Sequence, residues 1–188
     1  APFSLHAHGA PPFSPGNMFQ VRSLIADSLN AASVVHVAAL GYHSMMVDPG
    51  SGRILGRAVP TAALRHTQFS LVHDMVKDRK ARFWHATAGG LYFWEPSMPL
   101  LAAPKPDSGN GTHGIVVEGV DVRQLVLTAD TLWALLHEGA ILRIVGDRTL
   151  RIAPPDHLAR RMFGFAQAGT DRFWITTTDG PLRYTPLR

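Results

Sequence analysis

The hydrophobic positions of this chain fall in short runs separated by turns. In the segment 72–96, apolar residues alternate with polar ones or run together over a few positions, and a polar turn and a glycine turn separate the runs. Short runs bounded by Gly, Asp and Pro are typical of β-strands joined by tight turns. An amphipathic helix would repeat its apolar positions every 3.6 residues, and these windows do not. We expect helical turns only around 60–65 and 156–161.

The order of strands and turns in this segment recurs three more times along the chain. In three of the four copies a tryptophan marks the second strand, at Trp84, Trp133 and Trp174, which lie 49 and 41 residues apart. The first copy is the most divergent and has Val37 where the tryptophan is expected. Repeats of about 40–50 residues with three or four strands each are typical of β-propeller blades.

The sequence therefore predicts an all-β protein. We expect a β-propeller made of about four repeated four-stranded antiparallel blades, forming either a four-bladed ring or part of a larger propeller. One small sheet cannot bury both of its faces, so neighbouring blades must stack, and the tryptophans are expected to pack between them. A Pro/Gly-rich arm or initial strand covers 1–18, and the blades cover about 19–65, 66–117, 118–157 and 158–188.

Composition and charge narrow the class of protein. Hydrophobic residues make up 46% of the chain and charged residues 17%, which suits a folded domain. The chain has no cysteine, so disulfides, thiolate metal sites and cysteine nucleophiles are excluded. No apolar run reaches about 20 residues, so we expect no membrane insertion. The net charge is +4, but the basic residues are scattered and their densest run, 77–82, reads as a solvated turn. We therefore expect no nucleic-acid partner.

The sequence holds no motif that predicts catalysis. The stretch 109–114 is formally G-x-G-x-x-G, but a Pro-rich segment precedes it and no helix pattern follows, so we interpret it as a loop between strands. Ten histidines are present, including His6 and His8, without the spacing or carboxylates of a known metal motif. We expect no catalytic residue, metal or cofactor in this chain.

Candidate ligand-binding residues follow from their position within the repeat. Arg22, His73 and Arg123 each come just after the first apolar residue of a first strand, and Phe163 takes this place in the fourth copy. The first strand of a propeller blade lines the central channel. These polar side chains would either bind an anionic or polyhydroxy ligand through charge-assisted hydrogen bonds, or bond water and neighbouring strands around the axis.

Residues that recur at the same positions of the repeat carry a family resemblance. The second copy has an acidic turn, a tryptophan, a threonine, a Gly-Leu-Tyr step and a closing proline, at Asp78, Trp84, Thr87, 90–92 and Pro96. The last copy has the corresponding Trp174, Thr177, Gly180, Leu182, Tyr184 and Pro186. Over about 20–188 this pattern resembles the two-component regulator propeller repeat.

The resemblance implies a sensor. Such repeats form the extracytoplasmic ligand-sensing propellers of histidine kinases and diguanylate cyclases, several of them linked to carbohydrates. We therefore expect a periplasmic or extracytoplasmic, non-catalytic segment of a bacterial signalling receptor that binds a small molecule or glycan. Any output enzyme would lie outside this chain. Family members carry more than four repeats, so a second copy or a missing propeller segment is an expected partner.

Two other functions stay open at this point. The chain could be a protein-interaction scaffold or a self-assembling partial propeller, since an open arc would leave two exposed blade faces. It could also be a propeller lyase or hydrolase, similar in architecture to streptogramin lyases, which use a metal and a central His/Glu set. The glutamates available for that chemistry are Glu95, Glu118 and Glu138.

Overall fold

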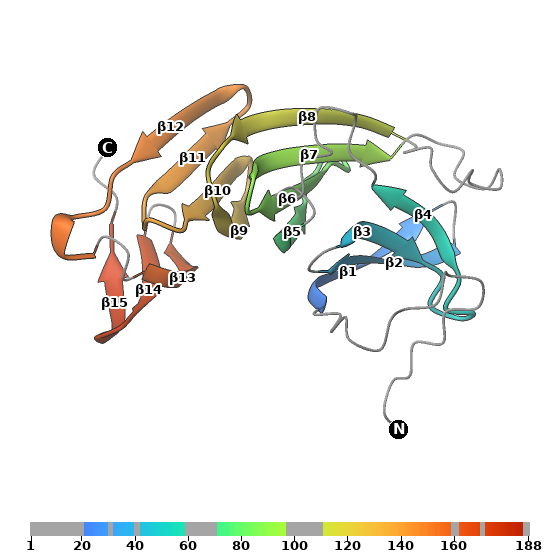
Figure 1. The fold of residues 1–188 in the computed structure, drawn as a ribbon, viewed down its shortest axis with the longest axis horizontal. Coiled ribbons are helices and arrows are strands. Elements are labelled where there is room, and N and C mark those ends of the chain that lie inside the picture. The colour runs from blue at the N-terminus through green and yellow to red at the C-terminus, as the bar shows by residue number, and fades with distance from the viewer. Residues whose placement is uncertain are drawn as a thin grey trace.

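Antiparallel sheets make up nearly all of the described structure. The structure, a computed structural model, describes residues 21–29, 32–39, 42–58, 71–96, 111–158, 162–169 and 172–185. Within these ranges the only helical element is a single 3-10 turn, η3 (Asp156–Leu158), inside one of the two segments predicted to be helical. The predicted all-β class is confirmed (Figure 1). The predicted arm, 1–18, and the predicted turn at 60–65 lie outside the described residues.

Each sheet is formed by one stretch of chain whose strands pair in sequence order. The first sheet contains β1 (Val21–Leu29), β2 (Ala32–Ala39), β3 (Tyr42–Val47) and β4 (Ile54–Ala58). The second contains β5 (Val72–Lys77), β6 (Phe83–Thr87), β7 (Gly90–Pro96) and β8 (Gly111–Glu118). The third contains β9 (Val122–Thr128), β10 (Thr131–Leu136), β11 (Ile141–Val145) and β12 (Arg148–Ile152). The fourth contains β13 (Met162–Gly169), β14 (Arg172–Thr177) and β15 (Gly180–Tyr184).

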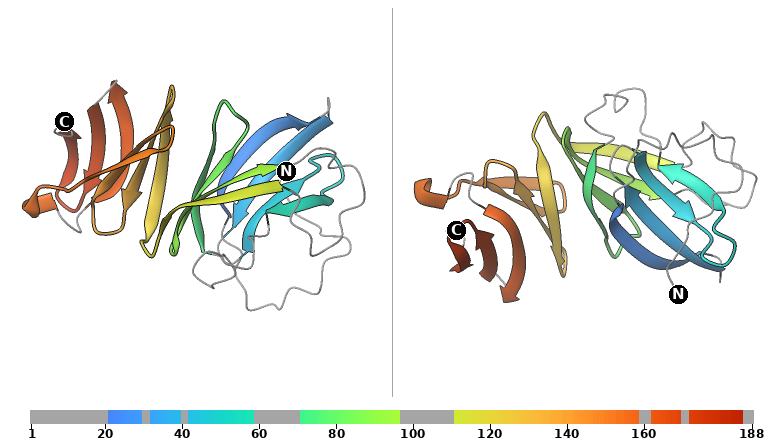
Figure 2. Two further views of the ribbon diagram at one scale, coloured as in Figure 1. Left: turned by 90° about the horizontal axis from the view of Figure 1, so that it is seen from above. Right: turned by 60° about the horizontal axis from the view of Figure 1, so that its bottom comes forward.

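The four sheets lie side by side in an open arc. The first strands β1, β5, β9 and β13 are neighbours on its concave side, whereas β4, β8 and β12 lie on the convex side (Figure 1). The first and fourth sheets stand at opposite ends of the arc in other views as well (Figure 2). The sheets are therefore propeller blades, but they do not close into a four-bladed ring. The last blade has three strands rather than four within the described residues.

A repeated hydrogen-bond pattern explains the threonine and glycine that recur in the hairpin turns. In the second blade, Thr87 Oγ1 donates to the Gly90 carbonyl at 2.8 Å and accepts from the Gly89 N–H at 3.2 Å. In the fourth blade, Thr177 Oγ1 donates to the Gly180 carbonyl at 2.8 Å. Gly90 has φ +147°, and a Cβ there would lie 2.1 Å from the Val117 carbonyl oxygen. The turn consequently requires glycine at this position.

Tryptophan packs between blades at two of the three predicted positions. Trp84 is buried against the third blade, and Trp133 is buried against the fourth, with its ring centroid 4.8 Å from that of Phe173. The prediction is wrong for Trp174, which is 51% exposed. Because side chains alternate along a strand, Trp174 points away from Phe173 and Ile175, which face the third blade. It therefore lies on the open end face of the arc.

In the first blade, His36 rather than Val37 takes the place of the tryptophan. Trp84 pairs with Val76, and its indole N–H donates to Asp78, two residues after Val76, at 2.9 Å. His36 likewise pairs with Ile25, and its Nε2 lies 3.5 Å from Asp27, two residues after Ile25. Only the pairing between the first and second strands, which the spacing of the sequence does not reveal, fixes this assignment.

The contacts of His36 match this assignment. Its ring stacks on Phe83 of the second blade at 3.8 Å between centroids, as Trp133 meets Phe173 two interfaces further along. Trp133 also donates its indole N–H to a side chain at the end of its own first strand, Thr128 Oγ1, at 3.1 Å. A ring that faces the next blade, with its ring nitrogen near an acceptor on or directly after the first strand, is thus common to three blades.

The glycine-rich stretch 109–114 is not a loop over the part that the structure describes. Residues 111–114 belong to strand β8, which pairs with β7, so the loop interpretation is wrong for them. A Cβ on Gly114 would lie 2.2 Å from Phe93 Cε1. This glycine therefore makes room for an aromatic ring of the neighbouring strand, and phosphate binding does not explain it.

Candidate ligand site

A β-bulge occurs at the same place in the first strand of every blade. In each case one residue is left out of the pairing between the first and second strands: Arg22 in β1, His73 in β5, Arg123 in β9 and Phe163 in β13. A bulge inserts an extra residue into one strand and re-aims its side chain. The three candidate ligand residues are therefore the bulged residues of adjacent strands on the concave side of the arc.

In the first three blades, the residue after the bulge bonds the next blade. In each case its side chain bonds the backbone of the second residue after the next bulge. Ser23 Oγ donates to the Met75 carbonyl at 3.1 Å, and Asp74 Oδ2 accepts from the Leu125 N–H at 2.9 Å. Gln124 accepts from the Phe165 N–H at 2.8 Å and donates to the Phe165 carbonyl at 3.0 Å. Bonding between neighbouring strands was one of the two roles considered for Arg22, His73 and Arg123. Their chain neighbours make these bonds, and His73 also contacts the next blade through Asp121.

Asp121 connects two of the three bulged residues. Its Oδ1 lies 3.2 Å from His73 Nε2, and its Oδ2 accepts from Arg123 Nη2 at 2.6 Å. The His73 side chain is 13% exposed and the Arg123 side chain 40% exposed. Arg22 is exposed, and Phe163 is 62% exposed on the fourth bulge. We call Arg22, His73, Asp121 and Arg123 the bulge cluster.

The charged members of the bulge cluster act on the pKa of His73. Burial lowers the pKa of His73 below its usual value, and the positive charges of Arg123 and Arg22 lower it further, whereas Asp121 acts in the opposite direction. The charge of Arg22, one blade away, is therefore felt at His73. The structure brings all three predicted residues into one electrostatic environment.

Sequence reasoning missed Asp121. This residue precedes the first strand of the third blade, and its place depends on two backbone contacts. The Gly119 N–H donates to the Gly89 carbonyl at 2.9 Å, and the His137 N–H donates to the Asp121 carbonyl at 2.8 Å. Gly119 has φ +75°, a conformation that favours glycine. The signal available in the sequence was a Gly-x-Asp step just before Val122.

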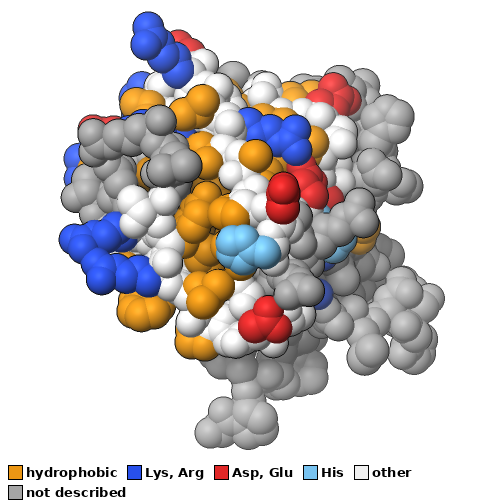
Figure 3. All heavy atoms as spheres, turned by 90° about the vertical axis from the view of Figure 1, so that its left-hand side faces the viewer, with side chains coloured by type: hydrophobic (Ala, Val, Ile, Leu, Met, Phe, Trp, Pro, Cys, Tyr) orange, Lys and Arg blue, Asp and Glu red, His pale blue; other side chains and the backbone are white. Residues whose placement is uncertain are grey.

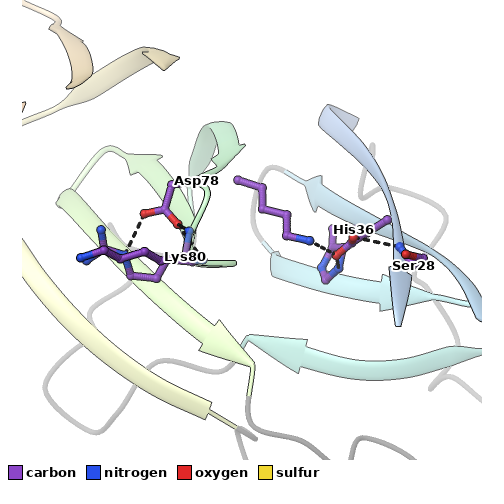
Figure 4. A network of polar contacts seen from close by, with 7 residues as sticks. Ser28, His36, Asp78 and Lys80 are labelled. Atoms are coloured by element: carbon purple, nitrogen blue, oxygen red, sulfur yellow. Dashed lines mark hydrogen bonds and ion pairs between the residues drawn. The ribbon is translucent and has the colours of Figure 1, made fainter. Parts of the chain in front are cut away.

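A second polar cluster lies inside the interface between the first two blades. Lys77 Nζ donates to Asp27 Oδ2 at 2.6 Å, and Asp27 Oδ1 accepts from the Ser28 N–H at 2.8 Å. Burial raises the pKa of Asp27, but these hydrogen bonds outweigh burial and hold the pKa below its usual value. Burial lowers the pKa of the neighbouring His36 to about 4. Figure 4 shows His36 and Ser28 here, with Asp78 and Lys80 in the next blade.

The residues considered for a metal or for lyase chemistry lie apart in the described structure. Across 21–185, leaving out the undescribed gaps, no three His, Asp or Glu side chains gather as metal ligands. Of the glutamates considered for a lyase, Glu138 Oε1 accepts from Arg151 at 2.5 Å and Glu95 lies 4.0 Å from Arg82. In the same part of the chain, no helix is long and apolar enough to cross a membrane.

Comparison with known proteins supports the fold. No protein-family model matches the chain, and no curated protein sequence matches it. Among solved structures, the extracellular domain of a protein described as a hybrid two-component system of B. thetaiotaomicron superposes with a TM-score of 0.59 at 20% identity, over 96% of this chain and 23% of that one. A second such domain gives 0.57 at 13% identity, over 85% and 22%.

A third match differs in length. The computationally designed protein Ika4 superposes with a TM-score of 0.56 at 15% identity, over 92% of this chain and 94% of that one. The chain therefore spans about a quarter of the length of the two extracellular domains and nearly all of the designed protein. At these identities the likeness concerns the fold.

Proposed function

We propose that this chain is a ligand-binding segment of an extracytoplasmic sensor propeller in a signalling receptor. The bulge cluster is its ligand site, and a polar small molecule such as a carbohydrate is its ligand. The observation that carries the proposal is that Arg22, His73 and Arg123 are the bulged residues of adjacent first strands. His73 and Arg123 both lie against the carboxylate of Asp121, and the charge of Arg22 acts on His73.

The chemistry of the cluster suits binding better than turnover. It offers charged hydrogen-bond donors on a rigid β scaffold, and such donors fix the orientation of a polar ligand. A nucleophile with an adjacent base, or a metal with an open position, would be needed for hydrolysis or elimination. The two hybrid two-component extracellular domains with the same fold support the assignment to a receptor, and their extracellular location supports an extracytoplasmic one.

Differential scanning fluorimetry of the purified chain tests this proposal. The panel contains neutral and acidic sugars, oligosaccharides, amino acids and organic acids, and each ligand that stabilises the chain is followed by NMR for consumption. We expect a rise in melting temperature with at least one class, no consumption, and loss of the rise in a variant carrying Arg22→Gln and Arg123→Gln. A folded chain that no member of the panel stabilises would contradict the proposal.

A second candidate function, self-assembly through the open end of the arc, is favoured by Trp174. This side chain is 51% exposed at the position where Trp84 and Trp133 are buried against a following blade. Figure 3 views this end of the molecule, where hydrophobic side chains lie among Lys and Arg. Sedimentation velocity at rising concentration would detect association, and Trp174→Glu should abolish it. A monomer at all concentrations would exclude this function.

A further inference from the structure

We propose that the bulge cluster selects a ligand that carries a carboxylate, with Arg123 as its main anchor. This inference rests on the proposed function and narrows its ligand class, because either an anionic or a neutral polyhydroxy ligand could bind through charge-assisted hydrogen bonds.

The charges of the cluster favour an anion. It contains two guanidinium groups, Arg22 and Arg123, against the single carboxylate of Asp121, so it is positive even when His73 is neutral. Its first strands lie on the concave side of the arc (Figure 1), and the charges of Arg22 and Arg123 both act on His73. A positive site of this kind raises the local concentration of anions and repels cations, whereas a neutral sugar gains nothing from the net charge.

Arg123 has the free donors that a carboxylate needs. A guanidinium carries five N–H donors in a planar fork. Arg123 donates to Asp121 through Nη2, and its side chain remains 40% exposed. A carboxylate can bind such a fork through two parallel hydrogen bonds, which are stronger and more directional than bonds to a neutral hydroxyl. The anchor is thus in place before a ligand arrives.

The carboxylate of Asp121 competes with a ligand carboxylate for Arg123. Its carboxylate already accepts from Arg123 and approaches His73 at 3.2 Å, and its backbone is fixed by the His137 N–H. A ligand carboxylate at Arg123 would therefore feel repulsion from Asp121. Removing that charge should strengthen the binding of an acid while leaving the binding of a neutral ligand nearly unchanged.

Isothermal titration calorimetry with matched acid and neutral pairs tests the inference. The probes are sodium glucuronate with glucose and sodium galacturonate with galactose, at constant ionic strength. We expect at least one acid to bind at least tenfold more tightly than its neutral partner. Asp121→Asn should tighten its binding about fivefold, the factor that corresponds to the ~1 kcal/mol between two charges 4 Å apart in water. A gain of this kind cannot come from a variant that fails to fold.

Two further variants locate the anchor. Arg123→Gln should weaken acid binding at least tenfold, whereas Arg148→Gln, an equally simple change at an exposed position of β12, should leave it unchanged. Neutral sugars that bind as tightly as their acids would overturn the inference and leave the sensor proposal standing. Acid binding that is indifferent to Arg123→Gln would also overturn it. Failure of all four probes to bind would overturn the inference, and the sensor proposal would fall only if the wider panel were silent as well.

Discussion

The buried imidazole of His36 should make the first blade interface sensitive to acid. His36 is 2% exposed, stacks on Phe83 and has a pKa of about 4 rather than the ordinary 6.5. Above pH 6.5 the ring is neutral in the folded and the unfolded chain, so its titration does not affect stability. Between pH 6.5 and 4 the unfolded chain binds a proton that the folded chain does not, and the free energy of unfolding falls. Below pH 4 both states are protonated and the loss is complete.

The size of the loss follows from the shift. Each tenfold change in proton affinity corresponds to about 1.4 kcal/mol, so lowering the pKa from 6.5 to about 4 removes about 3 kcal/mol in total and about 2 kcal/mol by pH 5. For a domain whose stability is about 5–15 kcal/mol, this is a large fraction. Other groups titrate over the same range, so the contribution of His36 must be isolated by comparison with a variant.

His36→Phe provides that comparison, since a phenyl ring can keep the stacking on Phe83 but cannot bind a proton. Urea unfolding at pH 7, 6 and 5, followed by the fluorescence of the buried Trp84 and Trp133, gives the free energy of unfolding of both proteins. We expect the original chain to lose about 2 kcal/mol more than the variant between pH 7 and pH 5. Equal losses in the two proteins would refute the reasoning.

Three more predictions concern single contacts and are measured by urea unfolding unless stated otherwise. Asp78→Ala removes the acceptor of hydrogen bonds from the N–H groups of Lys80, Arg82 and Trp84, so it should lower the free energy of unfolding by about 2–4 kcal/mol. Asp130→Ala, the control at an exposed acid one blade further, should lower it by under about 0.5 kcal/mol. Equal losses in the two variants would contradict the prediction. Gly90→Ala places a Cβ 2.1 Å from a carbonyl oxygen and should lower the free energy of unfolding by well over about 2 kcal/mol. Gly146→Ala, at φ +57° with open space around it, should lower it by about 1 kcal/mol. The reverse order would show that the turn at Gly90 relaxes freely. Gln124→Ala removes both hydrogen bonds to the Phe165 backbone, so it should speed amide hydrogen exchange in β13 and leave exchange in β5 unchanged. Unchanged exchange in β13 would show that these bonds do not hold the blades together.

Much of the architecture could be predicted from local chemistry. Short apolar runs, turn residues and a repeat length of about 40–50 residues define blades because they depend on neighbours close in the chain. The packing role of Trp84 and Trp133 follows from the repeat as well, and the structure confirms it. The same reasoning failed for Trp174, because whether a face is covered depends on what stands beside the blade, and the repeat pattern carries no such information.

The pairing of strands decided two other points. Adjacent side chains of a strand point to opposite faces of the sheet, and the pairing of His36 with Ile25, near Asp27, shows that His36 and not Val37 takes the place of the tryptophan. The glycine-rich residues 111–114 have the composition of a loop, but their pairing with β7, where Gly114 lies opposite Phe93, makes them part of a strand.

The candidate site divides in the same way. The sequence by itself determined which residues occupy the equivalent position after the first apolar residue of each first strand, because that position is defined within one repeat. Only the tertiary structure decided that Arg22, His73 and Arg123 are bulged residues, that the charges of Arg22 and Arg123 act on His73, and that Asp121 contacts His73 and Arg123. These features arise from the stacking of separate blades, which brings together residues about 50 positions apart, and no local pattern encodes that distance.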